Sequence, residues 1–183
     1  KGIAMQPREI RDMHGAMIVQ TLKERRKFIV EEVMEYYRFL THTVSVTGSD
    51  KKELVKIDRS NDGTVKLEMY KIDKDCNQSS KMYDRTFNPL ITKELRVYGM
   101  DGDDKFQVTG TSDKIKTRII GGGGQDIFES NAKGSGPSLY DKLDGGNTVS
   151  GHFHNRMSND SMVNKFDWLG YKYPYQSIFA TIG

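Results

Sequence analysis

Two stretches of the sequence are nearly the same: residues 96–106 read RVYGMDGDDKF, and residues 118–128 read RIIGGGGQDIF. They begin 22 residues apart and share five letters in eleven positions. The shared residues are an arginine, two glycines, an aspartate and a phenylalanine: Arg96, Gly99, Gly102, Asp104 and Phe106 in the first copy, and Arg118, Gly121, Gly124, Asp126 and Phe128 in the second. Apolar residues precede the first glycine in both copies, so the sequence contains an internal repeat.

This repeat has the features of stacked β-coils. Short β-like runs that recur at a fixed period with glycine corners are typical of a solenoid. A single coil cannot bury its apolar side chains alone, so the repeat predicts that Phe106 stacks on Phe128 and that Val97 stacks on Ile119. A weaker third copy lies within residues 143–147. The competing interpretation is a twisted antiparallel sheet that contains two similar hairpins.

The residues before the repeat have other periodicities. From Pro7 to about Leu40, apolar residues recur at three and four positions, which predicts a long helix. Apolar and polar residues then alternate through residues 44–85, and Ser60-Asn61-Asp62-Gly63 is a strong hairpin signal. We therefore expect an α+β fold: an N-terminal long helix on an antiparallel β-meander, followed by a short β-solenoid-like Gly/Asp-rich repeat region. The expected parts are residues 1–91 for the helix plus β-meander, 92–150 for the β-repeat region and 151–183 for a C-terminal extension or linker.

Composition excludes several classes of protein. With 36% hydrophobic and 29% charged residues among 183, the chain can bury only a modest core. Its net charge of +3 is small and the two signs are interspersed, so we expect no nucleic-acid partner. No apolar run approaches the roughly 20 residues of a membrane-spanning helix. Cys76 is the only cysteine, which excludes an internal disulfide. Because the chain begins Lys-Gly-Ile, we take it as a segment of a longer protein.

The second glycine run fits a calcium-binding motif. Residues 121–129, GGGGQDIFE, match the nonapeptide G-G-x-G-x-D-x-U-x in full, whereas residues 99–107 depart from it at Met100. The repeats thus resemble those of repeat-in-toxin proteins, in which stacked turns hold Ca²⁺ on carboxylate and backbone oxygens. The predicted ligands are four aspartates: Asp101, Asp103, Asp104 and Asp126. The alternative needs no metal, because glycines can supply positive-φ corners and aspartates can bond their own backbone.

Other candidate sites are weaker. His152-Phe153-His154 places two imidazoles on one face of a strand, a spacing that can hold Zn²⁺, and two exposed histidines on a polar loop are the alternative. Nucleophilic catalysis has no anchor, because there is no nucleophile elbow and Cys76 has no histidine beside it. The glycine run does not predict a phosphate cradle, because no Gly-Lys-Ser/Thr follows it.

The order of several motifs resembles a segment of large envelope proteins of Bacteroidetes. The matching stretches are LKERR at 22–26, YYRFL at 36–40, VSVTGSD at 44–50, TKELRVYG at 92–99, GDDKF at 102–106 and IIGG at 119–122. In those proteins, a calcineurin-like metallophosphoesterase domain often precedes the segment and a surface-antigen-type outer-membrane β-barrel follows it. The metal-binding motifs of the phosphoesterase are absent from these residues. The resemblance therefore carries over no catalytic residue.

What the resemblance implies is a connector in the cell envelope, in the periplasm or associated with the outer membrane. We expect a non-catalytic structural or interaction module whose partners are the neighbouring domains of the same chain. Two alternatives stay open: a calcium-binding β-roll-like module, and a metal-dependent hydrolase that uses the aspartate cluster or His152 and His154. The expected cofactor is none, or Ca²⁺ at the four aspartates. The sequence leaves the oligomeric state open.

Overall fold

The computed structural model describes residues 2–73 and 77–167. Residue contacts group the chain into two compact units, one formed by Lys1–His42 and the other beginning at Thr43. Cys76 lies outside the described residues, and so does the predicted C-terminal extension beyond residue 167.

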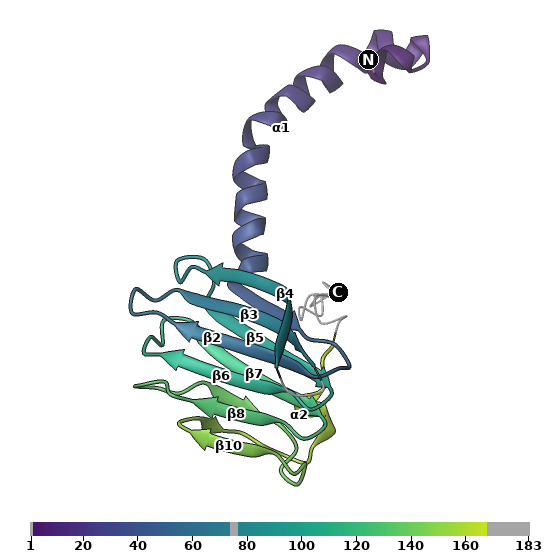
Figure 1. The fold of residues 1–183 in the computed structure, drawn as a ribbon. Coiled ribbons are helices and arrows are strands. Elements are labelled where there is room, and N and C mark those ends of the chain that lie inside the picture. The colour runs from purple at the N-terminus through teal and green to yellow at the C-terminus, as the bar shows by residue number, and fades with distance from the viewer. Residues whose placement is uncertain (1, 74–76, 168–183) are drawn as a thin grey trace, which may run out of the picture. The chain divides into compact units, whose positions relative to one another are not determined.

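The first unit is helical (Figure 1). A short 3₁₀ helix, η1 (Gly2–Met5), precedes the long helix α1 (Arg8–His42). The carbonyl of Pro7 accepts a hydrogen bond from the N–H of Arg11 at 3.0 Å, which closes the first turn. Within this unit α1 buries only Gly15, and its apolar side chains are left largely exposed. The helix predicted from Pro7 to about Leu40 is confirmed, with ends that differ by one or two residues.

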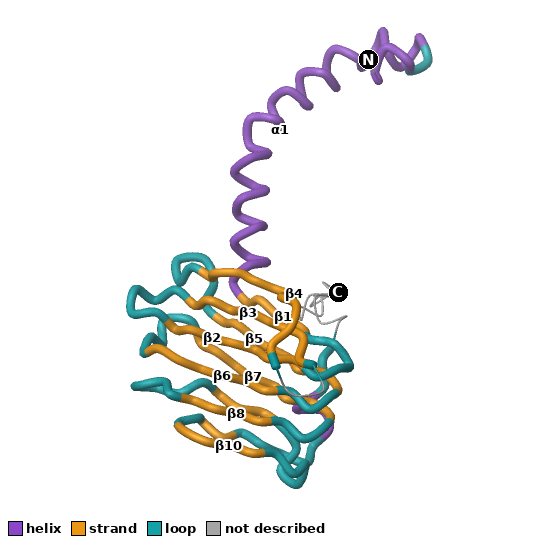
Figure 2. The backbone as a smooth tube through the Cα atoms, viewed as in Figure 1, coloured by secondary structure: helices purple, strands orange, loops and turns teal. Residues whose placement is uncertain are grey.

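The second unit contains two β-sheets (Figure 2). The five-stranded sheet has the order β1-β5-β7-β9-β11, and the six-stranded sheet has the order β10-β8-β6-β2-β3-β4. Strands of the first sheet are β1 (Thr43–Thr47), β5 (Glu94–Asp101), β7 (Lys116–Gly123), β9 (Ser138–Tyr140) and β11 (His154–Asn155). Strands of the second are β2 (Glu53–Arg59), β3 (Val65–Ile72), β4 (Gln78–Phe87), β6 (Lys105–Gly110), β8 (Ile127–Ser130) and β10 (Thr148–Gly151). A short helix, α2 (Ser161–Asn164), follows them.

From β4 onward, successive strands alternate between the two sheets, and most neighbours within a sheet are parallel. In this register Val97 pairs with Ile119 and Phe106 pairs with Phe128. The rings of Phe106 and Phe128 stack with their centroids 5.1 Å apart. The predicted pairing of residues 22 positions apart is therefore confirmed.

One hydrophobic core lies between the two sheets of this unit. Inward and outward side chains alternate along β2 and β6, as the pleat requires. The largest fully buried apolar side chains come from both sheets: Phe87, Phe106, Phe128, Ile57, Leu67, Met69, Leu95, Ile119 and Leu139, together with Ile115 from a connecting loop. The alternate positions of β2 and β6, which include Lys56, Asp58 and Gln107, face outward and carry polar side chains.

The predicted fold class is wrong in how it arranges these parts. The sequence predicts an antiparallel meander up to residue 91, but β1 pairs in parallel with β5 and β2 with β6. A boundary at residues 91 and 92 therefore cuts through both sheets, and the described strands form one mixed system rather than a meander plus a separate solenoid-like region. By their contacts, the residues of α1 group as a compact unit of their own. The rival interpretation, two similar antiparallel hairpins, is also wrong, because β5–β7 and β6–β8 are parallel.

Candidate functional site: a buried column of carboxyl groups

Four acidic side chains lie in the interior of the β unit, near one end of its strands. They are Glu53, Asp104, Asp126 and Asp141, here called the carboxyl column, and each is only 1% exposed. Glu53 begins β2, Asp104 directly precedes β6, Asp126 directly precedes β8, and Asp141 directly follows β9. Because β2, β6 and β8 are parallel neighbours in register, the first three acids occupy equivalent places in successive strands.

One oxygen of Asp104 and one oxygen of Asp126 bond the backbone of a neighbouring segment. Asp104 Oδ1 accepts the N–H of Glu53 at 2.8 Å, and Asp126 Oδ1 accepts the N–H of Asp104 at 2.8 Å. The same contact continues at the next position, where Asn147 Oδ1 accepts the N–H of Asp126 at 2.8 Å. These side chains therefore satisfy buried backbone donors where the chain turns between the two sheets.

Two repeat glycines give the column its space. A Cβ atom on Gly99 would lie 2.3 Å from Asp104 Oδ2, and a Cβ on Gly121 would lie 2.3 Å from Asp126 Oδ2 and 2.1 Å from Asp141 Oδ2. Neither glycine has a positive φ, so close approach and not backbone conformation requires it. The predicted positive-φ corners occur instead at Gly102 and Gly124, with φ of 118° and 119°.

Asp141 occupies the place of a glycine. Ile120 pairs with Tyr140, so the residues that follow these two, Gly121 and Asp141, are neighbours. Asp141 Oδ1 accepts its neighbour's N–H, from Lys142, at 2.6 Å. The carboxyl group therefore has a different position here than in the two repeats. Asp141 stands where the repeats have a glycine, and the neutral Asn147 stands where they have an aspartate.

Three carboxyl oxygens of the column have no hydrogen-bond partner: Asp104 Oδ2, Asp126 Oδ2 and Asp141 Oδ2. A buried, unpaired charge is costly, so burial favours the neutral acid. Burial raises the pKa of Asp104 to about 7 and that of Asp126 to about 8, and it also raises the pKa of Asp141. These acids therefore retain protons at pH values where exposed aspartates are ionised.

The structure divides the four predicted calcium ligands. Asp104 and Asp126 belong to the column, whereas Asp101 and Asp103 are exposed. Asp103 forms an ion pair with Lys52 at 2.6 Å, and its Oδ1 accepts the N–H of Gln125 at 3.0 Å. Among the described residues, no group of three or more His, Cys, Asp or Glu side chains is placed to hold a metal ion. Calcium binding stays a prediction, without an assembled set of ligands.

The two histidines of the zinc hypothesis are neighbours on the surface. The ring centroids of His152 and His154 are 5.8 Å apart, and both residues are exposed. His154 Nε2 lies 3.1 Å from the hydroxyl of Ser135. Two imidazoles and a hydroxyl do not make the three nitrogen, sulfur or carboxylate ligands that a catalytic zinc site uses.

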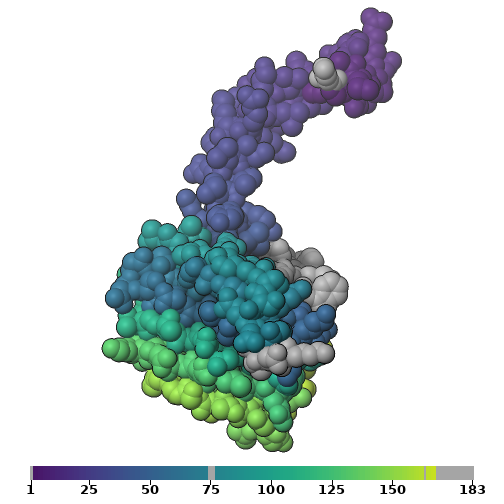
Figure 3. Space-filling model, viewed as in Figure 1, coloured from purple at the N-terminus to yellow at the C-terminus, as the bar shows by residue number. Residues whose placement is uncertain are grey.

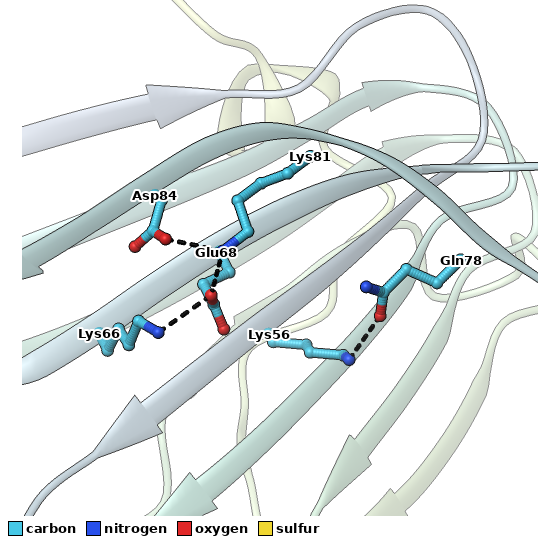
Figure 4. A network of polar contacts seen from close by, with 6 residues as sticks. All are labelled: Lys56, Lys66, Glu68, Gln78, Lys81 and Asp84. Atoms are coloured by element: carbon cyan, nitrogen blue, oxygen red, sulfur yellow. Dashed lines mark hydrogen bonds and ion pairs between the residues drawn. The ribbon is translucent and has the colours of Figure 1, made fainter.

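Charged residues on the outer face of the six-stranded sheet pair with one another (Figure 4). Glu68 Oε1 accepts hydrogen bonds from Lys81 at 2.7 Å and Lys66 at 3.0 Å, and Lys81 also bonds Asp84 at 2.7 Å. The two lysines lower the pKa of Glu68 to about 2. A small pocket on this face is lined by Lys56, Ile57, Asp58, Lys66, Glu68, Gln107 and Thr109. Its positive and negative groups are balanced, so it favours neither a cationic nor an anionic ligand.

No protein-family model, curated protein or solved structure matches this chain. Among the helices of the described residues, none has the length and apolar character that a bilayer crossing requires. The resemblance to envelope connectors of Bacteroidetes stays a prediction.

Two members of the column, Glu53 and Asp141, are not predicted from the sequence. A signal for Glu53 exists in a spacing: Gly48 precedes Glu53 by the same five positions that separate Gly99 from Asp104. Gly48 also approaches its acid closely, because a Cβ atom there would lie 2.8 Å from Glu53 Oε2. Asp141 has no such signal, since it replaces the glycine that the spacing would require.

Proposed function

We propose that this chain is a non-catalytic structural and interaction module of a larger cell-envelope protein, and that it positions the domains on either side of it. The main support for the proposal is the structural role of the acidic residues. The aspartates that a hydrolase would need are buried and bond backbone N–H groups of neighbouring strands. On the face of the β unit drawn in Figure 3, the described residues form a closed surface without a deep hollow. Both features fit a scaffold.

The interaction part of the proposal rests on α1. Its 35 residues span about 52 Å at ~1.5 Å per residue, and within its own unit its apolar side chains are exposed. Most of the stability of a helix in a protein comes from packing of an apolar face. The exposed large apolar residues of α1 include Met13, Met17, Leu22, Phe28, Ile29, Val30, Val33, Tyr36 and Phe39. A neighbouring domain of the same chain is the proposed partner of this surface.

A hydrolase screen tests the non-catalytic part. The purified chain is assayed against phosphomonoester, phosphodiester and carboxyl-ester substrates with Mg²⁺, Mn²⁺, Zn²⁺ or Ca²⁺, and we expect no turnover above that of the metal alone. Metal-dependent turnover that is lost in Asp104→Asn or His154→Ala, with the fold retained by circular dichroism, would overturn the proposal in favour of the hydrolase alternative.

A binding experiment tests the interaction part. The chain is titrated with the domains that flank it in its open reading frame, produced separately, and saturable binding is expected. The double variant Ile29→Lys/Val33→Lys changes two exposed apolar residues of α1 and should weaken binding at least tenfold. The matched control, Glu31→Lys/Glu35→Lys, makes a larger change in charge on the same helix and should retain most of the affinity. Equal loss in both double variants, or no binding to either domain, would contradict this role.

A further inference from the structure

Asp126 and Asp141 face each other across Gly121. The Oδ2 atoms of both carboxyl groups lie within 2.3 Å of one point, the place that a Cβ atom on Gly121 would occupy. Both Oδ2 atoms are buried and without a hydrogen-bond partner, while each Oδ1 already accepts a backbone N–H. Two carboxylates cannot satisfy each other, because an ionised carboxylate only accepts hydrogen bonds. One proton on either Oδ2 turns the contact into a hydrogen bond that satisfies both.

We propose that Asp126 and Asp141 share a single proton, carried on Asp126 Oδ2 and donated to Asp141 Oδ2, and that this proton holds the last turn of the two sheets together. The pair then carries one negative charge instead of two. Loss of the proton leaves two buried like charges between β7, β8 and β9. The stability of this part of the fold therefore depends on pH.

The surroundings assign the proton to Asp126. The N–H of Gly122 and the amide of Asn147 lie on the Asp141 side of the pair and favour its ionised form. The ionisable groups that act on Asp126 are Asp141 and Asp104, both acidic. Further along the column, the negative charges of Glu53 and Asp103 raise the pKa of Asp104. The lysine that neutralises Asp103, Lys52, is bound outside the column. Among the described residues, the groups that shift the pKa values of Asp126 and Asp141 are acidic side chains, the side chain of Asn147 and backbone N–H groups.

A metal ion is a poorer occupant than a proton. Of the three atoms nearest the Cβ position of Gly121, two are oxygens, Asp126 Oδ2 and Asp141 Oδ2, and the third is the Cγ of Asp141. Calcium requires six to eight oxygen ligands at roughly 2.3–2.6 Å, which these oxygens do not surround.

The direction of the pH effect follows from the raised pKa values. In the unfolded chain each aspartate ionises near its ordinary pKa, whereas burial raises the pKa of folded Asp126 to about 8. The folded state therefore binds more protons than the unfolded state between about pH 4 and pH 8. The stabilisation is fully present below the unfolded pKa and is lost as the pH rises through about 8. Each proton bound only by the folded state changes the folding equilibrium constant by up to about tenfold per pH unit.

Urea unfolding of the whole chain, at steps of half a pH unit from pH 5.5 to 9, measures how the folding equilibrium constant depends on the binding of this proton. For the native sequence the folding constant should fall as pH rises, with contributions from Asp104 and from the pair. In Asp141→Asn the amide Nδ2 donates to Asp126 Oδ2, so Asp126 ionises without losing its partner. The slope should then decrease by about one proton, a change of up to about tenfold per pH unit. Asp144→Asn, the neutralisation of an exposed aspartate three residues from Asp141, is the matched control and should leave the slope unchanged.

Carbon-13 NMR of the native chain gives a readout that needs no variant. The side-chain carboxyl carbons of Asp126 and Asp141 should shift together in a step above pH 6. If Asp141→Asn does not fold, Asp126→Asn tests the same pair from its other side, because its Oδ1 can still accept the N–H of Asp104.

Two results would overturn the proposal. One is separate titration of the two carboxyl groups below pH 5, together with the native slope in Asp141→Asn. The other concerns a cation: stability at pH 8.5 that is restored by 10 mM Ca²⁺ in the native chain but not in Asp141→Asn would show that a metal ion, not a proton, occupies the pair.

Discussion

Two carboxyl groups occupy the space that a side chain at residue 121 would fill, and Gly121 has no side chain. Asp126 Oδ2 and Asp141 Oδ2 both lie closer to the Cβ position of this residue than any real Cβ contact allows. A glycine at this place is therefore required by its neighbours across the core. Two of the three glycines that follow it in the run have another reason, since Gly122 and Gly124 have positive φ values of 113° and 119°.

Gly121→Ala should accordingly be among the most damaging small substitutions in the β unit. The added methyl group displaces both Oδ2 atoms, so we expect a loss of about 2–4 kcal/mol, in the range of overpacked or disrupted buried networks. Urea unfolding at pH 6 measures it. Gly123→Ala is a suitable control, because its Cβ would meet the end of the exposed Asp101 side chain, which can rotate away. Adding Asp141→Gly to Gly121→Ala should restore part of the loss, and failure to restore any would contradict the steric explanation.

Residue-level prediction from the sequence succeeded where a repeat marked the residue. Asp104 and Asp126 stand at the same place in two similar stretches, so they could be selected as a pair. Their role as backbone acceptors could not be separated from calcium ligation, because both use the same carboxylate oxygens. Asp141 could not be found, because a residue that breaks the repeat pattern becomes visible only once the neighbouring strands are aligned.

Within the elements, Phe106 on β6 and Phe128 on β8 form the centre of the stacked core. Their rings are nearly parallel, with an angle of 14° between planes, and Phe153 meets Phe128 edge-on with centroids 6.4 Å apart. Aromatic pairs of this kind contribute beyond the area that they bury. Phe128 is therefore the ring that joins two turns of the core.

Phe128→Ala should destabilise the β unit by about 3–5 kcal/mol, because it leaves a cavity beside two other rings. Phe128→Leu should cost less, since most of the volume is retained. The measurement is the urea midpoint of each variant. Ile127→Ala is the control on the same strand, because Ile127 is 40% exposed and points to the outer face. A loss as large for Ile127→Ala as for Phe128→Ala would contradict the inward stacking of Phe128.

At this scale the sequence predicted the existence of the elements better than their pairing. The helix follows from a 3.6-residue period and the strands from a period of two, and both are local patterns. Whether a strand pairs in parallel or antiparallel leaves no local trace, because both arrangements alternate side chains in the same way. The clear hairpin signal at residues 60–63 was correct for β2 and β3. It also suggested a longer meander than the chain forms, because β1 and β2 each have a parallel partner more than 40 residues later.

The whole molecule groups into two compact units, Lys1–His42 and the residues from Thr43 onward. A chain that begins at Thr43 should therefore fold without α1. Its melting temperature is expected to lie within about 3 °C of that of the full chain, since a difference of 1 kcal/mol corresponds to ~2–4 °C for a domain of this size. Differential scanning calorimetry measures it. An unfolded or molten product would show that residues 1–42 supply contacts on which the β unit depends.

The 22-residue register also has a consequence for how this chain can change in length. Each unit of the repeat contributes one strand to each sheet, and its Phe, Gly and Asp meet the same residues of the unit before it. A duplicated block of residues 105–126 inserted after Asp126 would therefore present the correct partners on both sides and lengthen the core by one layer. A block with one extra residue inside a strand would turn the inward side chains that follow it in that strand to the outside, because side chains alternate along a strand. The 22-residue insertion should retain a cooperative thermal transition and the 23-residue insertion should lose it. The fold should thus tolerate the insertion of whole 22-residue units, but not the insertion of single residues within the strands.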